Sequence, residues 1–528
     1  MAELKEVRSE KTEQNCKLIR RGEIMDYSEL QNGSDIRGIA LENEAKDTVN
    51  LTPGAVSCLG NAFASWLKNK SGKDSIRIAI GRDSRLSGED LLIAAAKGIN
   101  KSGHATVCDM GLASTPAMFM STVLGDDPFD GSIMITASHL PWYRNGMKFF
   151  TKDGGLEKED IKELTRIAGE ISDKYGDALN EDSKIEKVSF MDTYTGYLRD
   201  KIVAGCGKGE RPLDGLHIVV DAGNGAGGFF ASEVLEKLGA DTSGSKFLDP
   251  DGHFPNHIPN PENKEAAEAI KNATLEAKAD LGIIFDTDVD RAGAVLPGGK
   301  TLTRNDLIAA LSVIALKEHP GTTIVTDSVT SDGLARFIEA KGGIHKRFKR
   351  GYRNVINESI RLNESGSDSQ LAIETSGHGA FKENYFLDDG AYLMVKILIE
   401  LGKGNSIASL IDGLEEPAES AEIRFPVHTD GDLQENGDRI LAMLKEKAAG
   451  IPGWNEAVPN YEGVRINCDA EHGNGWLLLR KSLHEPIMPL NIESDSKGGT
   501  LLIAKTLFDV IKEESTLDLK PLKDFCGI

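Results

Sequence analysis

The sequence predicts an α/β protein: three related α/β domains with mainly parallel sheets, then a smaller C-terminal α+β domain, all around a central cleft. Three observations lead to this prediction. The chain has 528 residues, too many for one core at roughly 150 residues per domain. A pattern of an apolar strand feeding a helix occurs three times. The residues after position 412 follow a different pattern, with several strand-like segments before one long helix.

In each of the three repeats, an apolar strand ends at an aspartate, a polar turn follows, and the next helix stops at a glycine. The strands are Ser75–Asp83, Leu216–Asp221 and Thr322–Asp327, and the helices stop at Gly103, Gly239 and Gly342. Glycine suits the left-handed residue just past a helix end because it has no Cβ. Strands that alternate with helices predict parallel sheets covered by helices on both faces.

The last part of the chain contains three strand-like segments and then a helix from about residue 498 to 513. The strand-like segments are Glu422–His428, Gly463–Asn467 and Trp476–Arg480. This order predicts the α+β domain. The predicted divisions are a polar N-terminal arm at 1–31 and domains at 32–205, 206–303, 304–412 and 413–528.

Composition excludes several classes of protein. The formal net charge of −22 argues against nucleic acid or an anionic membrane as a partner. The six cysteines are scattered without metal-ligand spacing, which is typical of free thiols in a reducing compartment. No apolar run approaches the roughly 18 residues that span a bilayer, and no signal peptide is evident. The protein is expected to be cytoplasmic, although a removed organelle presequence would leave no trace here.

The acidic segment Phe285–Arg291 (FDTDVDR) follows an apolar run and carries aspartates at alternate positions. Asp286, Asp288 and Asp290 would repel one another at a strand end unless a cation lay between them. Oxygen ligands suit Mg²⁺, which readily shares its coordination with phosphate. The alternative is a solvated acidic turn, but the strand end and the trailing Arg291 favour a metal site.

The segment Ile133–Phe150 (IMITASHLPWYRNGMKFF) holds Ser138 on a tight loop directly after an apolar strand. A hydroxyl held in this way is a candidate nucleophile or phosphoryl carrier. The alternative is a turn in which Ser and Thr hydroxyls satisfy backbone amides. His139 would by itself more often be structural. The chain has no GxSxG elbow, so a hydrolase triad is not supported.

Three further polar segments are candidates for ligand binding. Lys346–Arg353 (KRFKRGYR) has five basic residues and no acid, which suits either a phosphate or a solvated basic face. Glu374–His378 (ETSGH) suits sugar hydroxyls, and Arg480–Pro486 (RKSLHEP) suits a phosphate. Each of the four domains therefore has a polar loop at a strand end, and such loops can converge at one cleft.

A rival interpretation concerns Gly223–Gly228 (GNGAGG), which satisfies GxGxxG after an apolar strand. Asp241 or Asp249 lies at about the distance of a ribose-binding acid, so the pattern would suit a dinucleotide-dependent oxidoreductase. One of three parallel repeats would need a turn here in any case. The rival also leaves the other polar loops unexplained.

The ordered set GSDIRG, GRDSR, TASHLP with NGMK, DTDVDR, KRGYR, ETSGH and RKSLHEP resembles the alpha-D-phosphohexomutase superfamily, in particular its phosphomannomutase/phosphoglucomutase branch. The resemblance runs from about Gly33 to Asp495. It implies four domains around a central cleft. It also implies an enzyme that interconverts hexose 1-phosphate and hexose 6-phosphate through a phosphoserine and a hexose bisphosphate intermediate.

The resemblance implies a role for each residue that matches the family pattern. The phosphoserine and the ligands of one Mg²⁺ per chain would be Ser138 with Asp286, Asp288 and Asp290. The residues near the transferred phosphoryl group would be Arg37, His139, Lys148 and Lys349. The residues that contact the substrate would be Arg291, Glu374, Ser376, His378, Arg480 and Ser482.

The chain departs from the family pattern in three loops. Leu140 stands where the serine loop often has Asn, and Thr287 where the metal loop usually has Gly, but neither change removes a ligand. In the last loop Leu483 and His484 replace a side-chain amide and a hydroxyl, and Asn491 stands where an arginine is often found. These changes predict altered phosphate binding there. A protonated His484 would partly compensate, so affinity would fall above pH ~6.5.

The function expected from the resemblance is a phosphohexomutase for mannose or glucose phosphates, primed by a hexose bisphosphate. One alternative is a catalytically weak, sugar-phosphate-binding regulator of the same fold. Less favoured are a phosphoglucosamine mutase and the dinucleotide-dependent oxidoreductase. The expected partner is a phosphorylated hexose, with no nucleic acid and no membrane, and the protein is expected to be a monomer or weak homodimer.

Overall fold

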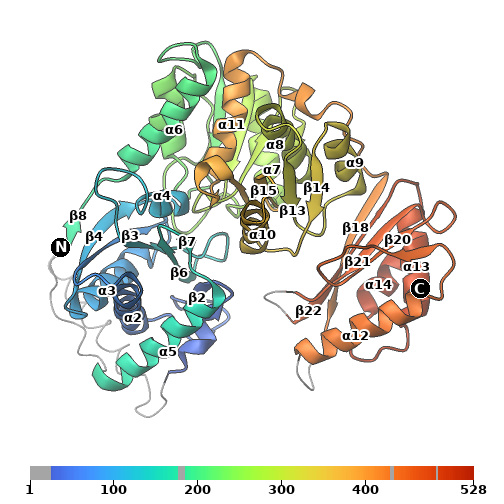
Figure 1. Ribbon diagram of the computed structural model, residues 1–528, viewed down its shortest axis with the longest axis horizontal. Helices are drawn as coiled ribbons and strands as arrows, with labels where there is room; N and C mark the ends of the chain where they lie inside the picture. The colour runs from blue at the N-terminus through green and yellow to red at the C-terminus, as the bar shows by residue number, and fades with distance from the viewer. Residues whose placement is uncertain (1–24, 176–184, 429–432, 483–485) are drawn as a thin grey trace.

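The computed structural model describes residues 25–175, 185–428, 433–482 and 486–528. It contains three α/β units, each built on a mixed sheet, and a fourth unit built on an antiparallel sheet (Figure 1). The predicted fold class is therefore confirmed. In each of the first three sheets, parallel strands form one side and antiparallel strands form the other. Among the described residues, no helix is both long and apolar enough to cross a membrane.

The first unit has a sheet in the order β1-β2-β6-β5-β3-β4-β8, with β7 paired to β6. Its strands are β1 (Gln31–Asn32), β2 (Asp35–Ile39), β3 (Ile76–Arg82), β4 (Ala105–Leu112), β5 (Gly131–Ile135), β6 (Arg144–Thr151), β7 (Gly154–Gly155) and β8 (Glu186–Lys187). Its helices are η1 (Tyr27–Leu30), α2 (Pro53–Ser71), α3 (Gly88–Lys101), α4 (Thr115–Met120) and α5 (Lys158–Tyr175). Alternate residues of β3 and β5 enter two different apolar cores, because successive side chains of a strand point to opposite faces.

Helix α6 (Met191–Cys206) leads into the second unit, whose sheet has the order β12-β11-β10-β9. The elements that follow are β9 (Ile218–Asp221), η3 (Phe230–Leu235), η4 (Glu236–Leu238), α7 (Lys264–Ala277), β10 (Leu281–Phe285), β11 (Ala292–Val295) and β12 (Thr301–Leu302). The helix expected after β9 is a π-helix followed by a 3-10 turn. The preceding glycines pack tightly: a Cβ at Gly225 would lie 2.7 Å from the Thr287 carbonyl oxygen. Helical structure therefore begins only at Phe230.

The third unit has a sheet in the order β14-β13-β15-β16-β17. Its strands are β13 (Thr323–Thr326), β14 (Ile344–Arg347), β15 (Ser369–Ile373), β16 (Gly379–Phe381) and β17 (Leu387–Asp388). Its helices are α8 (Arg304–Glu318), α9 (Asp332–Ala340), α10 (Tyr352–Glu364), η5 (Lys382–Asn384), α11 (Gly390–Lys403) and η6 (Ala408–Ile411). The glycines predicted to end the repeat helices adopt positive φ, at +78° for Gly103, +102° for Gly239 and +86° for Gly342.

The fourth unit has an antiparallel sheet in the order β18-β22-β21-β20-β19. Its strands are β18 (Glu419–Pro426), β19 (Trp454–Glu456), β20 (Val464–Cys468), β21 (Gly475–Leu479) and β22 (Ile487–Ser494), and its helices are α12 (Leu433–Ala448), α13 (Gly499–Ile511) and α14 (Lys520–Cys526). The sequence predicted β18, β20, β21 and α13 but not β22 or α12.

The packing of apolar side chains separates the fourth unit from the others. One continuous core runs through the first three units, whereas the fourth has a core of its own. The two are joined by a small apolar contact of Val329, Trp476 and Leu478. Helix α6 packs against α11 and η3, so we propose that the first unit ends before Met191, ahead of the boundary predicted at 205.

Candidate active site

The serine loop begins where β5 ends, and it places Ser138 in a constrained position. Ser138 has a φ of +50°, which is uncommon for a residue with a side chain, and it is only 8% exposed. Its N–H donates to Thr136 Oγ1 at 2.9 Å, and the Thr136 hydroxyl donates to Asp83 Oδ2 at 2.7 Å. The loop is therefore anchored to Asp83, which follows β3.

Arg85 holds the same loop from the other side. Its guanidinium, buried at 1% exposure, donates to the carbonyl oxygens of Ser138, Leu140, Pro141 and Arg144. Its Nε lies 3.3 Å from Asp83 Oδ2. The sequence reasoning did not assign Arg85 a role. The signal was its place in GRDSR, two residues after the strand-ending Asp83, but nothing local shows that its side chain turns inward.

Replacing Arg85 with lysine is expected to lower kcat by about 10²-fold, because an ammonium cannot reach four carbonyls and the serine loop would shift. Steady-state kinetics would measure this loss. The exposed Arg77→Lys is the control, since Arg77 pairs with Asp127 at the surface and should tolerate the change. An Arg85→Lys protein with unchanged kcat would show that the serine loop keeps its position without the hydrogen bonds from the Arg85 guanidinium.

The acidic loop between β10 and β11 lies against Ser138. Asp286, Asp288 and Asp290 are each no more than 1% exposed. Asp286 Oδ2 accepts a hydrogen bond from the Ser138 hydroxyl at 3.0 Å. Within the loop Val289 has a φ of +69°, an outlier for a β-branched side chain. The surrounding structure therefore imposes the loop conformation.

This loop fits a bound cation. Asp286, Asp288 and Asp290 each offer a carboxylate oxygen, and these atoms lie within 4.8 Å of one another. The Oδ1 atoms of Asp288 and Asp290 are buried and have no hydrogen-bond partner among the described residues. Unpaired buried carboxylate oxygens are costly, and a Mg²⁺ ion would satisfy them. Burial and the neighbouring Asp290 raise the pKa of Asp286 well above its usual value, as expected of crowded carboxyl groups without a metal.

Two basic side chains flank the acidic loop. Lys148 on β6 contacts both Asp288 Oδ2, at 3.0 Å, and Asp290 Oδ2. Burial alone would lower the pKa of Lys148, but these two carboxylates raise it well above its usual value. Arg291 Nη2 donates to Ser138 Oγ at 2.8 Å, and its Nε donates to Asp286 Oδ2 at 3.0 Å. A fixed positive charge therefore lies on each side of the carboxylates.

The two histidines of the site, His139 and His378, have different protonation states. Burial and the charges of Arg291 and Arg37 lower the pKa of His139 to about 2, so this imidazole is neutral and accepts at Nδ1 from Arg291 Nη2 at 2.6 Å. Burial would also lower the pKa of His378, but Asp388 outweighs it and raises the value to about 9. His378 Nδ1 lies 2.5 Å from Asp388 Oδ2. At neutral pH His378 is therefore an imidazolium cation and His139 a neutral imidazole.

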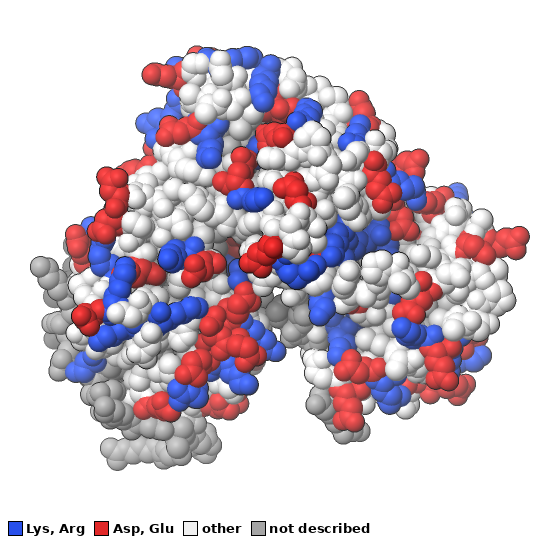
Figure 2. Space-filling view, in the orientation of Figure 1, with Lys and Arg blue, Asp and Glu red and all other residues white. Residues whose placement is uncertain are grey.

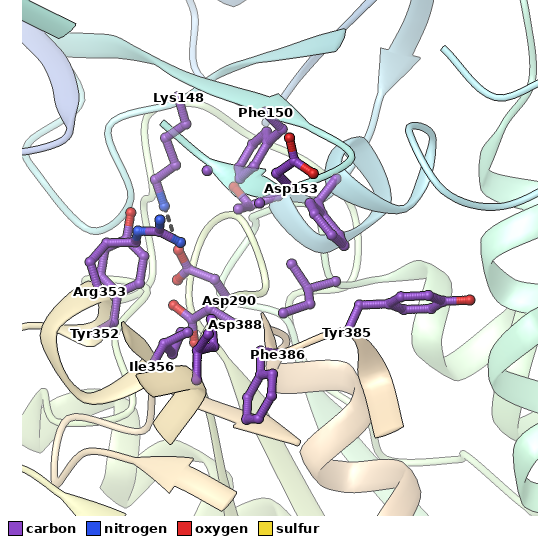
Figure 3. A pocket seen from close by; sticks show the side chains of 16 residues that line it. Lys148, Phe150, Asp153, Asp290, Tyr352, Arg353, Ile356, Tyr385, Phe386 and Asp388 are labelled. Atoms are coloured by element: carbon purple, nitrogen blue, oxygen red, sulfur yellow. Dashed lines mark hydrogen bonds and ion pairs between the residues drawn. The ribbon is translucent and has the colours of Figure 1, made fainter. Parts of the chain in front are cut away.

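The predicted residues of the first three units converge around Ser138. Arg37 donates to the Thr136 carbonyl oxygen at 2.7 Å, and the Nδ1 atom of His378 lies 3.8 Å from Asp290 Oδ1. Lys148 and Asp290 point at one another in Figure 3, with Tyr352 and Asp388 around the same hollow. Tyr352 stacks on His378 with a centroid distance of 5.2 Å. The structure thus brings together three loops that lie far apart in the sequence.

Glu374 and Ser376 lie on the loop after β15, beside this cluster. Glu374 Oε1 accepts from the Gly351 amide at 2.5 Å, and the Ser376 hydroxyl donates to Glu374 Oε2 at 3.3 Å. The two residues are 4% and 8% exposed, so both are buried. A carboxylate and a hydroxyl at this position suit hydrogen bonds to sugar hydroxyls.

Comparison with known proteins identifies the family. Residues 28–174, 194–299 and 304–417 match, in order, the α/β/α domains I, II and III of phosphoglucomutase/phosphomannomutase. A phosphoglucomutase of Neisseria gonorrhoeae is 30% identical over 488 residues, covering 92% of this chain and 96% of that protein. The chain belongs to the phosphoglucomutase/phosphomannomutase family.

Two further relatives of the family agree with this assignment. A phosphomannomutase/phosphoglucomutase of Pseudomonas putida is 32% identical over 443 residues, covering 82% of this chain and 88% of that protein. A crystal structure of a phosphoglucomutase/phosphomannomutase family protein from Burkholderia thailandensis superposes with a TM-score of 0.75 at 26% identity, covering 94% and 99% of the two chains. The family assignment therefore extends over nearly the whole chain.

In the glycine-rich loop Gly223–Gly228, which matches the dinucleotide-binding pattern, backbone N–H groups already donate hydrogen bonds within the protein. The N–H groups of Asn224, Gly225 and Ala226 donate to the carbonyl oxygens of Phe247, Ala222 and Thr287. The Gly223 N–H donates to Asp221 Oδ1 at 2.8 Å. A pyrophosphate would need these amides free. In this mutase-family chain, the loop supports the acidic loop through Thr287.

The fourth unit presents Arg480 and Ser482 at the end of β21. Arg480 is 6% exposed, and the Ser482 N–H donates to the Ile487 carbonyl oxygen at 3.1 Å. Leu483 and His484, where the chain departs from the family pattern, lie outside the described residues. Figure 2 shows a hollow between the first and fourth units, with Lys and Arg side chains gathered at its upper end. Of the residues predicted in the first three units, Lys349 is the exposed one, and no contact between it and the Ser138 cluster is found among the described residues.

Proposed function

We propose that this protein is a phosphohexomutase that interconverts hexose 1-phosphate and hexose 6-phosphate through a phosphorylated Ser138. Phospho-Ser138 transfers its phosphoryl group to the free hydroxyl of the substrate, giving a hexose bisphosphate. The bisphosphate turns over, and its other phosphoryl group returns to Ser138. The observation that carries the proposal is the Ser138 hydroxyl, which touches both Arg291 and a carboxylate of the acidic loop.

The acidic loop supports binding of one Mg²⁺ per chain. Asp286, Asp288 and Asp290 would hold the ion together with an oxygen of phospho-Ser138. When bound, the ion supplies positive charge that offsets the negative charge of the transferred phosphoryl group. The unpaired Oδ1 atoms of Asp288 and Asp290 support this assignment.

The other side chains of the cluster have roles that follow from their charges. Arg291, Lys148 and Arg37 remain cationic and offset the charge spread over the phosphoryl oxygens. His139 is neutral, so it orients Arg291 through a hydrogen bond instead of adding charge. His378 is protonated and paired with Asp388, and its Nδ1 lies 3.8 Å from Asp290 Oδ1, so it adds positive charge beside the acidic loop.

The remaining loops support the choice of substrate. Glu374 and Ser376 would bind sugar hydroxyls, and Arg480 and Ser482 would bind the phosphate that is not transferred. The bisphosphate must bind in two orientations, so these contacts have to accept either end of the sugar. We propose glucose and mannose phosphates as substrates, with a hexose bisphosphate as the primer that phosphorylates Ser138.

A coupled assay with glucose 1-phosphate, mannose 1-phosphate and glucosamine 6-phosphate tests this function, together with intact mass to detect phospho-Ser138. Turnover of the first two, stimulated by Mg²⁺ and a sugar bisphosphate, is expected. If only glucosamine 6-phosphate is turned over, the substrate is an amino sugar phosphate. No turnover and no phosphoserine would favour a sugar-phosphate-binding regulator.

Ionisation of Glu374 is expected to make the KM for the substrate change with pH. Burial and the nearby Asp327 raise the pKa of Glu374 to about 7, so its carboxyl is ionised above this pH and neutral below it. A neutral carboxyl is a weaker acceptor, so KM is expected to rise by up to about tenfold as pH falls from about 8 to 6. Glu374→Gln, measured over the same range, separates this effect from ionisation of the substrate. If the two proteins have parallel KM profiles, Glu374 does not titrate in this range.

A further inference from the structure

The tip of the acidic loop is held by backbone contacts from each of the first three units. Consecutive carbonyl oxygens of the loop each accept one backbone N–H: Thr287 from Ala226 at 2.8 Å, Asp288 from Thr115 at 2.8 Å and Val289 from Gly390 at 3.1 Å. The three donors belong to the second, first and third units respectively. The conformation of the loop, with its positive φ at Val289, therefore depends on contacts from all three units.

Thr115 makes a second contact with the same loop. It is the first residue of α4, it is 3% exposed, and its hydroxyl donates to Asp288 Oδ2 at 2.5 Å. Its own helix does not use this hydroxyl, because Ser114 is the N-cap and accepts from the Ala117 N–H at 3.2 Å. The backbone and the side chain of Thr115 thus both hold one residue that is 173 positions away in the sequence.

The contacts of Asp288 distinguish its two carboxylate oxygens. Oδ2 accepts from the Thr115 hydroxyl and from the Lys148 ammonium at 3.0 Å. Oδ1 is buried and has no hydrogen-bond partner among the described residues. Both donors to Oδ2 belong to the first unit, which also carries Ser138. Because these donors oppose rotation of the carboxylate, Oδ1 is the atom that remains for a cation.

Lys148 by itself does not fix the orientation of Asp288. Its ammonium also pairs with Asp290 Oδ2, and the two side chains point at one another in Figure 3. An ammonium group is a rotatable point charge on a flexible stem, so it supplies charge to both carboxylates without fixing either plane. The Thr115 hydroxyl lies on a β-branched side chain with few rotamers and makes a directed hydrogen bond.

We propose that Thr115 is a positioning residue of the metal site. It holds the Asp288 carboxylate so that Oδ1 remains available to Mg²⁺, and it fixes the acidic loop to the unit that carries Ser138. This inference rests on the proposed function, because the ion would be the one that serves phosphoryl transfer. Neither the sequence motifs nor the charges of the site indicate a role for this neutral side chain.

The test separates the hydroxyl of Thr115 from its shape. Thr115→Val removes the hydroxyl but keeps the branched side chain and the backbone contact, whereas Thr115→Ser keeps the hydroxyl. Electron paramagnetic resonance gives the Kd of Mn²⁺, and the coupled assay gives kcat. We expect Thr115→Val to raise the Kd of Mn²⁺ about tenfold and to lower kcat by a similar factor. Thr115→Ser should remain within about threefold of the parent in both measurements.

Thr122→Val is the matched control. Thr122 is also a buried threonine, seven residues after Thr115, and its hydroxyl donates to the Phe119 carbonyl oxygen at 2.7 Å. This substitution should change neither the Kd of Mn²⁺ nor kcat. A second comparison uses the Asp288→Asn protein, in which Thr115→Val is expected to add less than about twofold to the Kd, because residues that act through one contact are not additive.

Each outcome bears on a stated claim. An unchanged Kd of Mn²⁺ in a Thr115→Val protein whose Tm shows that it is folded would overturn the role of Thr115, while the metal site would stand. A tenfold rise that Thr122→Val reproduces, or that Thr115→Ser does not reverse, would also overturn it. If the Kd rises tenfold in Thr115→Val alone but no protein turns over a hexose phosphate, Thr115 positions the metal site and the proposed mutase function fails.

Discussion

Replacing Ser138 with alanine is expected to abolish turnover, with a loss of kcat of at least about 10⁴-fold, because no other group replaces a covalent phosphoryl carrier. The fold should persist, since Arg291 and Asp286 still pair with each other at 3.0 Å. Intact mass of the parent should show one added phosphoryl group after incubation with a sugar bisphosphate, and the variant should show none.

Ser132→Ala is the control for Ser138→Ala. Ser132 is also a buried serine, on β5 six residues earlier, and its hydroxyl donates to the Met118 carbonyl oxygen at 2.6 Å. This substitution is expected to lower stability by about 1 kcal/mol and to leave turnover intact. A Ser138→Ala protein that remains active, or that still takes up a phosphoryl group, would place the carrier at another residue.

Replacing Asp288 with asparagine is expected to lower kcat by about 10²–10³-fold and to raise the Mg²⁺ concentration needed for half-maximal activity. The asparagine keeps the shape of the side chain but removes a negative charge from the cluster that would hold the ion. Among the described residues, it also leaves Lys148 with Asp290 as its remaining ion-pair partner. Mn²⁺ binding followed by electron paramagnetic resonance measures the lost affinity without relying on turnover.

Asp214→Asn provides the comparison for Asp288→Asn, because Asp214 forms an exposed ion pair with Arg211 at 2.8 Å. It should leave both kcat and Mn²⁺ affinity unchanged. Full activity of Asp288→Asn at low Mg²⁺ would show that the acidic loop does not hold the catalytic metal. A loss of kcat with normal Mn²⁺ affinity would instead assign Asp288 to the positioning of Lys148.

Much of the fold could be predicted because its signals are local. The strands that end at Asp83, Asp221 and Asp327 were evident from apolar runs followed by polar turns. Strand β22 was not predicted, although it pairs with both β18 and β21. Its sequence, IMPLNIES, contains a proline and mixes apolar with polar residues, so its place between β18 and β21 depends on its neighbours.

Side-chain direction limited what could be predicted of the site. Lys349 and Arg350 are adjacent and both basic, yet Lys349 is exposed, whereas the Arg350 side chain is only 22% exposed and lies 4.0 Å from Asp327. The turn from β14 into α10 decides which of the two points inward, and sequence spacing does not specify that turn. Arg85 was overlooked for the same reason, because its four carbonyl partners are more than fifty residues away along the chain.

The family, the three repeated α/β units and the loops that carry Ser138, the acidic cluster and Glu374 could be predicted from local sequence patterns. The chemical state of these residues depends on contacts that form only in the folded protein. His139 and His378 are the same amino acid, but burial and two arginines lower the pKa of the first, while Asp388 outweighs burial and raises the pKa of the second. Protonation depends on burial and on the nearest charges, and folding brings those charges from distant parts of the chain.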